Sequence, residues 1–151
     1  MTVQILSLVN LFFAGLPAGE ELMISYGVRA PLAGLADRPH IELRQALILR
    51  LRVAVPILFG LTLLTGAVAA WLGGFGRAFD LRCAALIALV TFISVTLGGT
   101  VPINVAALSW NSAAPPDNWR TLVEKWERLD TIRTCAALAA FVLFLAAMAV
   151  S

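Results

Sequence analysis

The chain has 151 residues, of which 60% are hydrophobic and 13% are charged. Soluble globular domains carry roughly 25% charged residues, so this composition excludes a soluble fold and indicates an integral membrane protein. The net charge of +2 is accounted for by basic residues that flank the apolar segments. No separate basic patch remains, so nucleic acid is not an expected partner.

Four apolar segments are each close to the roughly 20 residues that cross a bilayer as an α-helix. They cover about residues 3–28, 53–72, 81–106 and 132–150. We therefore expect one all-α domain over residues 1–151. Its predicted fold is a four-helix transmembrane bundle with a short amphipathic cytoplasmic helix leading into the fourth span.

The first segment contains polar residues that are unusual in a membrane span. Asn10 and Glu21 lie near one helical face, and Glu20 is beside them. A glutamate here either faces the bundle interior or is solvated at the membrane interface; adjacent positions diverge by about 100°, so both are not expected to face inward. The sequence MTVQIL lacks the basic region of a cleavable signal peptide, so this span is expected in the mature protein.

The segment before the second span is predicted to be a loop over residues 29–41 followed by a helical approach. The loop contains the only histidine, His40, which predicts a surface residue and neither a haem nor a zinc site. Gln45 and Arg52 share one face of the approach, whereas Arg44 is expected to point elsewhere. Arg52 either snorkels toward lipid headgroups or acts as a counter-ion for acidic residues at the same depth.

The third span ends in a pair of polar residues. Thr100 and Asn104 are four residues apart, which places a hydroxyl and an amide on one side of a helix. Gly98 and Gly99 precede them and permit another helix to approach closely.

The fourth span follows a turn at Pro115 and Pro116, after which Asp117 is expected to cap the new helix. Asp130 and Arg133 lie on the apolar face of this helix. Charges in apolar surroundings need partners, so these two either pair with each other or belong to a site. The charges expected to be solvated lie off this face: Glu124, Lys125, Glu127 and Arg128.

The distribution of basic residues predicts the orientation of the spans. Arginine and lysine are concentrated between spans one and two and between spans three and four. These two connections are expected in the cytoplasm. The protein is therefore predicted to be a multi-pass plasma (inner) membrane protein with both termini outside the cytoplasm.

The polar residues of the four spans occur at similar depth, near the expected cytoplasmic ends of the helices. If the faces that carry them meet, they form a polar pocket beneath an apolar bundle, with tryptophans as its roof. The acidic, basic and polar candidates are Glu20, Glu21, Gln45, Arg52, Thr100, Asn104, Asp130 and Arg133, and the roof candidates are Trp110, Trp119 and Trp126.

Three stretches of the chain, LRQALILRLRVAVP, VPIN and PPDNWRTLVEKWERLDTIRT, resemble the anthrone oxygenase family of small four-span membrane proteins. The most specific residues are Pro102, Ile103 and Asn104, and Trp126 followed by Arg133. At Asp130 the chain departs from the family, whose members often have histidine there.

The resemblance implies a membrane oxygenase, since fungal members convert anthrones to anthraquinones with molecular oxygen. The expected substrate is an anthrone-type or other lipophilic aromatic phenol, and no metal or cofactor is predicted. Glu20 or Glu21 would be the base, with Arg52 and Arg133 as oxyanion partners. The Asn104 amide would orient the substrate, and the Trp126 ring would stack against it. Gln45 and Thr100 are further predicted substrate-binding residues, and Asp130 is a further predicted catalytic residue.

Two other functions are compatible with the sequence. Small residues in spans two and four suit helix association in lipid, as expected for a non-catalytic subunit of a larger membrane complex or for a homo-oligomer. A lipophilic small-molecule binder is the other alternative. Transport is disfavoured, because four spans without an internal repeat do not form a two-sided path alone.

Overall fold

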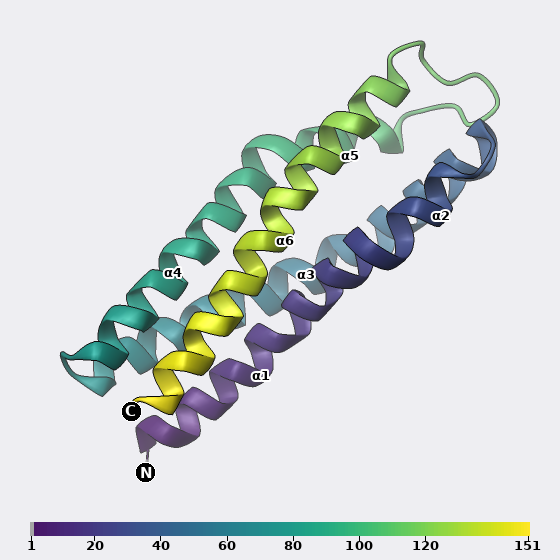
Figure 1. Cartoon of the computed structure of the whole chain (residues 1–151). Coiled ribbons are helices and arrows are strands. Elements are labelled where there is room, and N and C mark those ends of the chain that lie inside the picture. The colour runs from purple at the N-terminus through teal and green to yellow at the C-terminus, as the bar shows by residue number, and fades with distance from the viewer. Residues whose placement is uncertain (1) are drawn as a thin grey trace.

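The computed structural model describes residues 2–151 and contains four long helical spans, which confirms the all-α four-helix bundle (Figure 1). Each span is apolar and long enough to cross a bilayer. The spans are built from α1 (Thr2–Met23), η1 (Ile24–Val28) and α2 (Arg29–Ala33); α3 (Asp37–Gly73); α4 (Arg77–Val95), η2 (Thr96–Thr100) and α5 (Val101–Leu108); and α6 (Trp119–Ala149). The segments η1 and η2 are single turns of π-helix.

Both termini and the turn at residues 74–76 lie at one end of the bundle, here called the terminal end (Figure 1). The connections 34–36 and 109–118 lie at the opposite end, the loop end. At the terminal end the turn is made by Gly74 and Gly76, whose φ angles are 70° and 141°. Glycine adopts such angles without the steric cost that a Cβ would add, so α3 and α4 can reverse direction within this turn.

The core of the bundle is built from small and aromatic residues. Ala85 and Ala140 are almost fully buried where α6 packs against its neighbours α4 and α1. Phe59 of α3 stacks on Phe92 of α4 with ring centroids 3.7 Å apart. Lipid removes most of the hydrophobic driving force between helices, so this close packing and the buried polar contacts hold the spans together.

Both π-helical turns coincide with a glycine four residues before a proline. Gly27 precedes Pro31 at η1, and Gly98 precedes Pro102 at η2. A proline cannot donate to the carbonyl four residues earlier and its ring crowds that carbonyl, so one hydrogen bond of the α-helical ladder is lost there. A π-turn accommodates the interruption and shifts the direction of the following side chains.

Several boundaries differ from the predictions. The loop predicted at residues 29–41 is largely helical, and His40 is a buried residue of α3 that contacts Trp119 edge to face, so the predicted surface position was wrong. Helix α6 begins at Trp119 and runs into the fourth span without a break. Asp117 does not cap it: the N-cap residue is Asn118, which makes no side-chain cap hydrogen bond.

Candidate functional site

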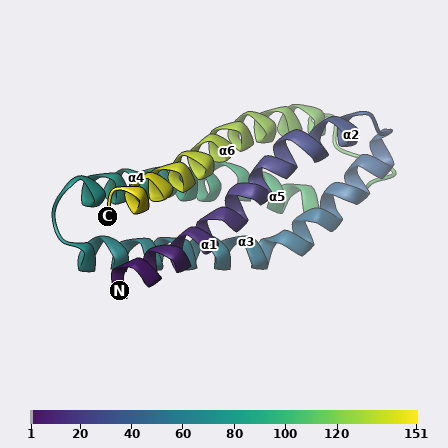
Figure 2. The same ribbon diagram turned by 60° about the horizontal axis from the view of Figure 1, so that its bottom comes forward.

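A cavity of about 320 Å³ lies in the half of the bundle nearer the loop end. Its size falls within the roughly 300–1,000 Å³ typical of small-molecule sites. It is surrounded by all four spans, with α3 on one side and η2, α5 and α6 on the other; Figure 2 shows this arrangement of helices. We call it the pocket. Its lining includes Glu20, Glu21, Arg29, Arg44, Ile48, Arg52, Val55, Pro56, Thr100, Val101, Asn104, Val105, Trp126, Asp130 and Arg133.

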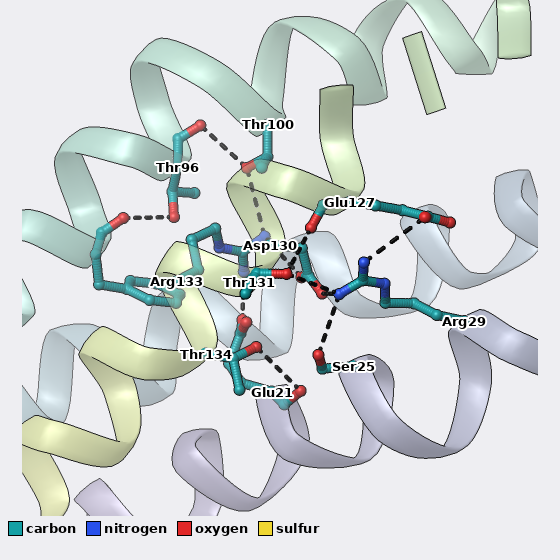
Figure 3. Close-up of polar contacts among 11 residues, drawn as sticks. Glu21, Ser25, Arg29, Thr96, Thr100, Glu127, Asp130, Thr131, Arg133 and Thr134 are labelled. Carbon is teal, nitrogen blue, oxygen red and sulfur yellow. Dashed lines mark hydrogen bonds and ion pairs between the residues drawn. The ribbon is translucent and has the colours of Figure 1, made fainter. Parts of the chain in front are cut away.

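The deep wall of the pocket is an ion-pair network centred on Arg133. Its guanidinium donates hydrogen bonds to the Glu21 carboxylate and, at 3.4 Å, to the Thr100 hydroxyl (Figure 3). The expected pairing with Asp130 is also present, at 3.9 Å. All four side chains are buried, so each charge depends on the others for compensation.

Arg29 extends this network toward the loop end. It was not predicted from the sequence to be a site residue. It donates to the hydroxyls of Ser25 at 3.2 Å and Thr131 at 3.0 Å (Figure 3). Its guanidinium also lies 3.6 Å from Glu127 and 3.7 Å from Asp130. Glu127 was expected to be solvated, but it is half-buried and paired across the helices.

Arg44 is the second pocket residue that was not predicted from the sequence. It was expected to point away from the site, yet it is 5% exposed and lines the pocket. Its guanidinium carbon lies 4.7 Å from the centre of the Trp126 ring, a cation–π geometry. The pocket-facing stripe of α3 includes Arg44, Ile48 and Val55. Residues spaced i, i+4 and i+11 lie on one face of a helix, so this stripe could have been found in the sequence. The prediction instead chose the neighbouring face, which carries Gln45 and Arg52.

Gln45, predicted to bind substrate, is not among the residues that line the pocket. Its amide donates to the backbone carbonyls of Ala107 at 2.9 Å and Trp110 at 3.0 Å, which fastens α3 to the end of α5. Trp110 and Trp119 belong to a separate buried cluster at the loop end. Of the three predicted roof residues, Trp126 contributes to the pocket wall.

Seven side-chain atoms of pocket-lining residues are buried without a hydrogen-bond partner among residues 2–151: Glu20 Oε2, Glu21 Oε2, Arg44 Nε, Asn104 Oδ1, Trp126 Nε1, Asp130 Oδ2 and Arg133 Nε. Those of Glu20, Asn104 and Trp126 belong to side chains outside the ion pairs described above. Buried polar groups are normally paired, so each of these atoms is suited to a ligand group. Carboxylate and amide oxygens accept hydrogen bonds, whereas the indole nitrogen donates one. A ligand complementary to these atoms would be mostly apolar and would carry both a donor and an acceptor.

Glu20 and Glu21 both line the pocket, contrary to the expectation that at most one would face inward. They have different roles in the network, because Glu21 is paired with Arg133 whereas Glu20 has no ion-pair partner within residues 2–151. No three His, Cys, Asp or Glu side chains within the same residues are grouped to hold a metal ion.

These features define a multi-pass membrane protein with a polar-walled pocket enclosed by its four spans. The profile of the anthrone oxygenase family matches residues 46–143, which include most of the pocket, and the chain belongs to this family. No curated protein and no solved structure is significantly similar to the chain.

Proposed function

We propose that the chain is a membrane oxygenase that oxidises an anthrone-type or other lipophilic phenolic substrate with molecular oxygen. The observation that carries this proposal is the unpaired carboxylate oxygen of Glu20, buried beside an apolar pocket together with the free polar atoms of Asn104 and Trp126. A carboxylate held in such surroundings is suited to abstract a proton from a weakly acidic C–H group. Family membership supports the same chemistry.

In the proposed reaction, Glu20 removes a proton from a methylene carbon flanked by aromatic rings and conjugated to a carbonyl. The electron pair moves onto the carbonyl oxygen, and the resulting electron-rich anion reacts with O₂ to form a carbon-bound hydroperoxide after Glu20 returns the proton. Loss of water converts that carbon to a second carbonyl. One oxygen atom of O₂ enters the product and the other leaves as water, so the substrate supplies all the electrons and the proposal needs no metal or organic cofactor.

The remaining pocket residues have supporting roles in this proposal. Arg44 and the indole N–H of Trp126 are the donors that would stabilise the oxyanion, because neither is paired with a carboxylate. Asn104 orients a substrate hydroxyl through its free Oδ1. Arg133 and Glu21 fix the wall against which the substrate lies. Arg52, proposed from the sequence as an oxyanion partner, is exposed at the edge of the pocket and is assigned to substrate admission instead.

Oxygen consumption by the purified protein in lipid nanodiscs, with anthrone as substrate, tests this function. We expect one O₂ consumed for each quinone formed, faster than in protein-free nanodiscs, where anthrone oxidises spontaneously. Rates equal to that background with a panel of phenolic anthrones would contradict the proposal. A visible absorption band in the protein as purified would contradict the cofactor-free mechanism alone.

A second function, binding of a lipophilic molecule without turnover, is favoured by the same free polar atoms, since they suit a ligand whether or not it reacts. Ligand retention without oxygen consumption would identify it. The subunit alternative has less support. Of its small residues, Ala69, Ala137 and Ala140 are buried within the chain's own bundle, which leaves exposed ones such as Ala67 and Ala139 for a partner.

We further propose that the protein resides in the plasma (inner) membrane with its loop end in the cytoplasm and both termini outside. Arginines concentrate at the loop end, in agreement with the positive-inside rule. A phosphatase reporter, active only outside the cytoplasm, should be active when fused after Ser151. An inactive phosphatase combined with active cytoplasmic reporters at the same position would reverse this orientation.

A further inference from the structure

The pocket is not equally enclosed on all sides. Its lining residues on α1, η1, α2 and α6 are all buried or half-buried. The exposed ones are Arg52 and Pro56 on α3 and Val101 and Val105 on α5. These four residues therefore mark a lateral opening between α3 and α5, which we call the window.

The window is bounded along both helices by contacts between them. Toward the terminal end, Phe59 stacks on Phe92 and closes α3 against α4. Toward the loop end, Gln45 holds the carbonyls of Ala107 and Trp110 and closes α3 against α5. Between these contacts the third span contains the π-turn η2, which redirects the helix. The window is therefore closed at each end by a contact between the second and third spans.

The surface around the window is apolar. Val53 and Ile57 on α3 are 60% and 55% exposed, and Leu97 on η2 is 65% exposed. Arg52 is the first residue before the apolar run of the second span, a position typical of the boundary between lipid tails and headgroups. The window therefore faces the hydrocarbon of the leaflet nearer the loop end.

Polarity changes from the window to the interior of the pocket. Pro56, Val101 and Val105 line the outside, with Arg52 at the edge nearer the loop end, whereas the free atoms of Glu20 and Asn104 lie within. A ligand that fits this gradient has a polar ring at one end and a hydrocarbon chain at the other. The ring would meet the free polar atoms while the chain remained in the lipid, so the chain would not have to enter the 320 Å³ cavity.

We infer that the pocket takes its substrate sideways from the bilayer through the window, and that this substrate is an amphiphile whose apolar tail extends between α3 and α5 into the lipid. Only the chemistry of the polar ring in this inference rests on the proposed function. Access and tail placement follow from the window and apply equally to a bound ligand that does not react.

A photoreactive probe tests the placement of the tail. The probe is 4-dodecylphenol with a diazirine in the middle of the alkyl chain, added to the full chain in phosphatidylcholine nanodiscs and irradiated. Peptide mass spectrometry should locate the label at residues 52–57 and 101–105 and show that excess unlabelled 4-dodecylphenol suppresses it. Labelling that is spread over all lipid-facing helices, or that is not suppressed, would overturn the inference.

A bulky side chain in the window tests the route. Val105→Trp should lower suppressible labelling by about tenfold, the scale on which a filled pocket discriminates against a ligand. Ile87→Trp is the matched control, because Ile87 is also lipid-facing on the third span, 68% exposed and remote from the pocket. It should label as the parent protein does. Equal labelling of both variants would overturn the route.

The outcome separates this inference from the proposed oxidation. Suppressible labelling at the window without oxygen consumption leaves the lateral route standing and rejects the oxygenase. Oxygen consumption with anthrone that is unaffected by Val105→Trp, without labelling at the window, supports the oxygenase and rejects the lateral route.

Discussion

Glu21 and Arg133 form an ion pair between α1 and α6 in which the two side chains are 2% and 9% exposed. The same guanidinium reaches Thr100 on η2, so it connects three of the four spans at the level of the pocket. Moving charges out of water is costly and is offset here by their mutual attraction. The pair is therefore a structural element of the pocket wall, and Glu20 is the one pocket carboxylate without an ion pair among residues 2–151.

Breaking this pair should destabilise the fold. Arg133→Leu leaves the Glu21 carboxylate buried without compensation, which typically costs about 3–5 kcal/mol. Thermal unfolding in detergent, followed by circular dichroism, measures the loss. Combining it with Glu21→Leu should restore most of the stability, because apolar replacement of both partners is often close to neutral. A double variant no more stable than Arg133→Leu alone would contradict the pairing.

An exposed pair provides the control for that experiment. Arg38 and Glu42 also form an ion pair, at 2.9 Å, but their side chains are 70% and 50% exposed. Solvent screens such pairs, so Arg38→Leu should leave the unfolding temperature unchanged. A comparable loss in both variants would show that general charge removal, and not burial of the Glu21 partner, causes the effect.

Glu20→Gln should abolish turnover while preserving the fold. Glutamine has the same shape but cannot accept the substrate proton, and loss of a general base typically lowers the rate by about 10²–10⁴-fold. Glu20 has no ion pair within residues 2–151 that the change would break. Oxygen consumption measures the rate, and Glu124→Gln on the exposed surface of α6 is the control. Full activity of Glu20→Gln would assign the base to another residue.

The number and class of helices followed directly from the sequence, because apolar runs of membrane length have few other structures available. The face of α6 was also predictable, since Trp126, Asp130 and Arg133 repeat with helical spacing over a long regular helix. The π-turns were not predicted. Their signal, a glycine four residues before a proline at both Gly27 and Gly98, is meaningful only once the helix is known to continue through the proline.

The site was harder to predict than the fold, because a charged residue near a helix end has the same sequence whether it snorkels or turns inward. Arg44 and Arg52 are only two turns apart on α3, yet Arg44 is buried over Trp126 and Arg52 is exposed. The pairing of Arg29 with Asp130 depends on how α2 meets α6, which local periodicity cannot specify. Tertiary packing decides between these alternatives.

Gln45→Leu should weaken the fold without removing a substrate contact. The amide donates to the backbone carbonyls of Ala107 and Trp110. The Ala107 carbonyl also accepts from the Trp110 N–H, so the change removes the donor of the Trp110 carbonyl, and an unpaired buried acceptor costs about 1–3 kcal/mol. Thermal unfolding should therefore shift downward, while KM for anthrone, measured below that transition, should stay close to the parent value. A large rise in KM with unchanged stability would restore the substrate-binding role expected from the sequence.

Two glycines of α3 provide a matched test of helix packing. A Cβ added at Gly66 would lie 2.6 Å from the Phe144 ring of α6 and 3.2 Å from the Asn10 amide. That amide already donates to the Thr62 carbonyl at 2.9 Å, so it cannot move without loss of a buried bond. Gly66→Ala should therefore destabilise the protein by about 1–3 kcal/mol, as overpacking does.

Gly60 is the matched position on the same helix, because an added Cβ there would meet no atom within 4 Å. Gly60→Ala should be neutral or stabilising by up to about 1 kcal/mol, since alanine is the better helix former. Thermal unfolding of both variants in the same detergent measures the difference. Equal stability of Gly66→Ala and Gly60→Ala would mean that α3 does not approach α6 and α1 as closely as Phe144 and Asn10 indicate, and the enclosure of the pocket by four spans would then have to be revised.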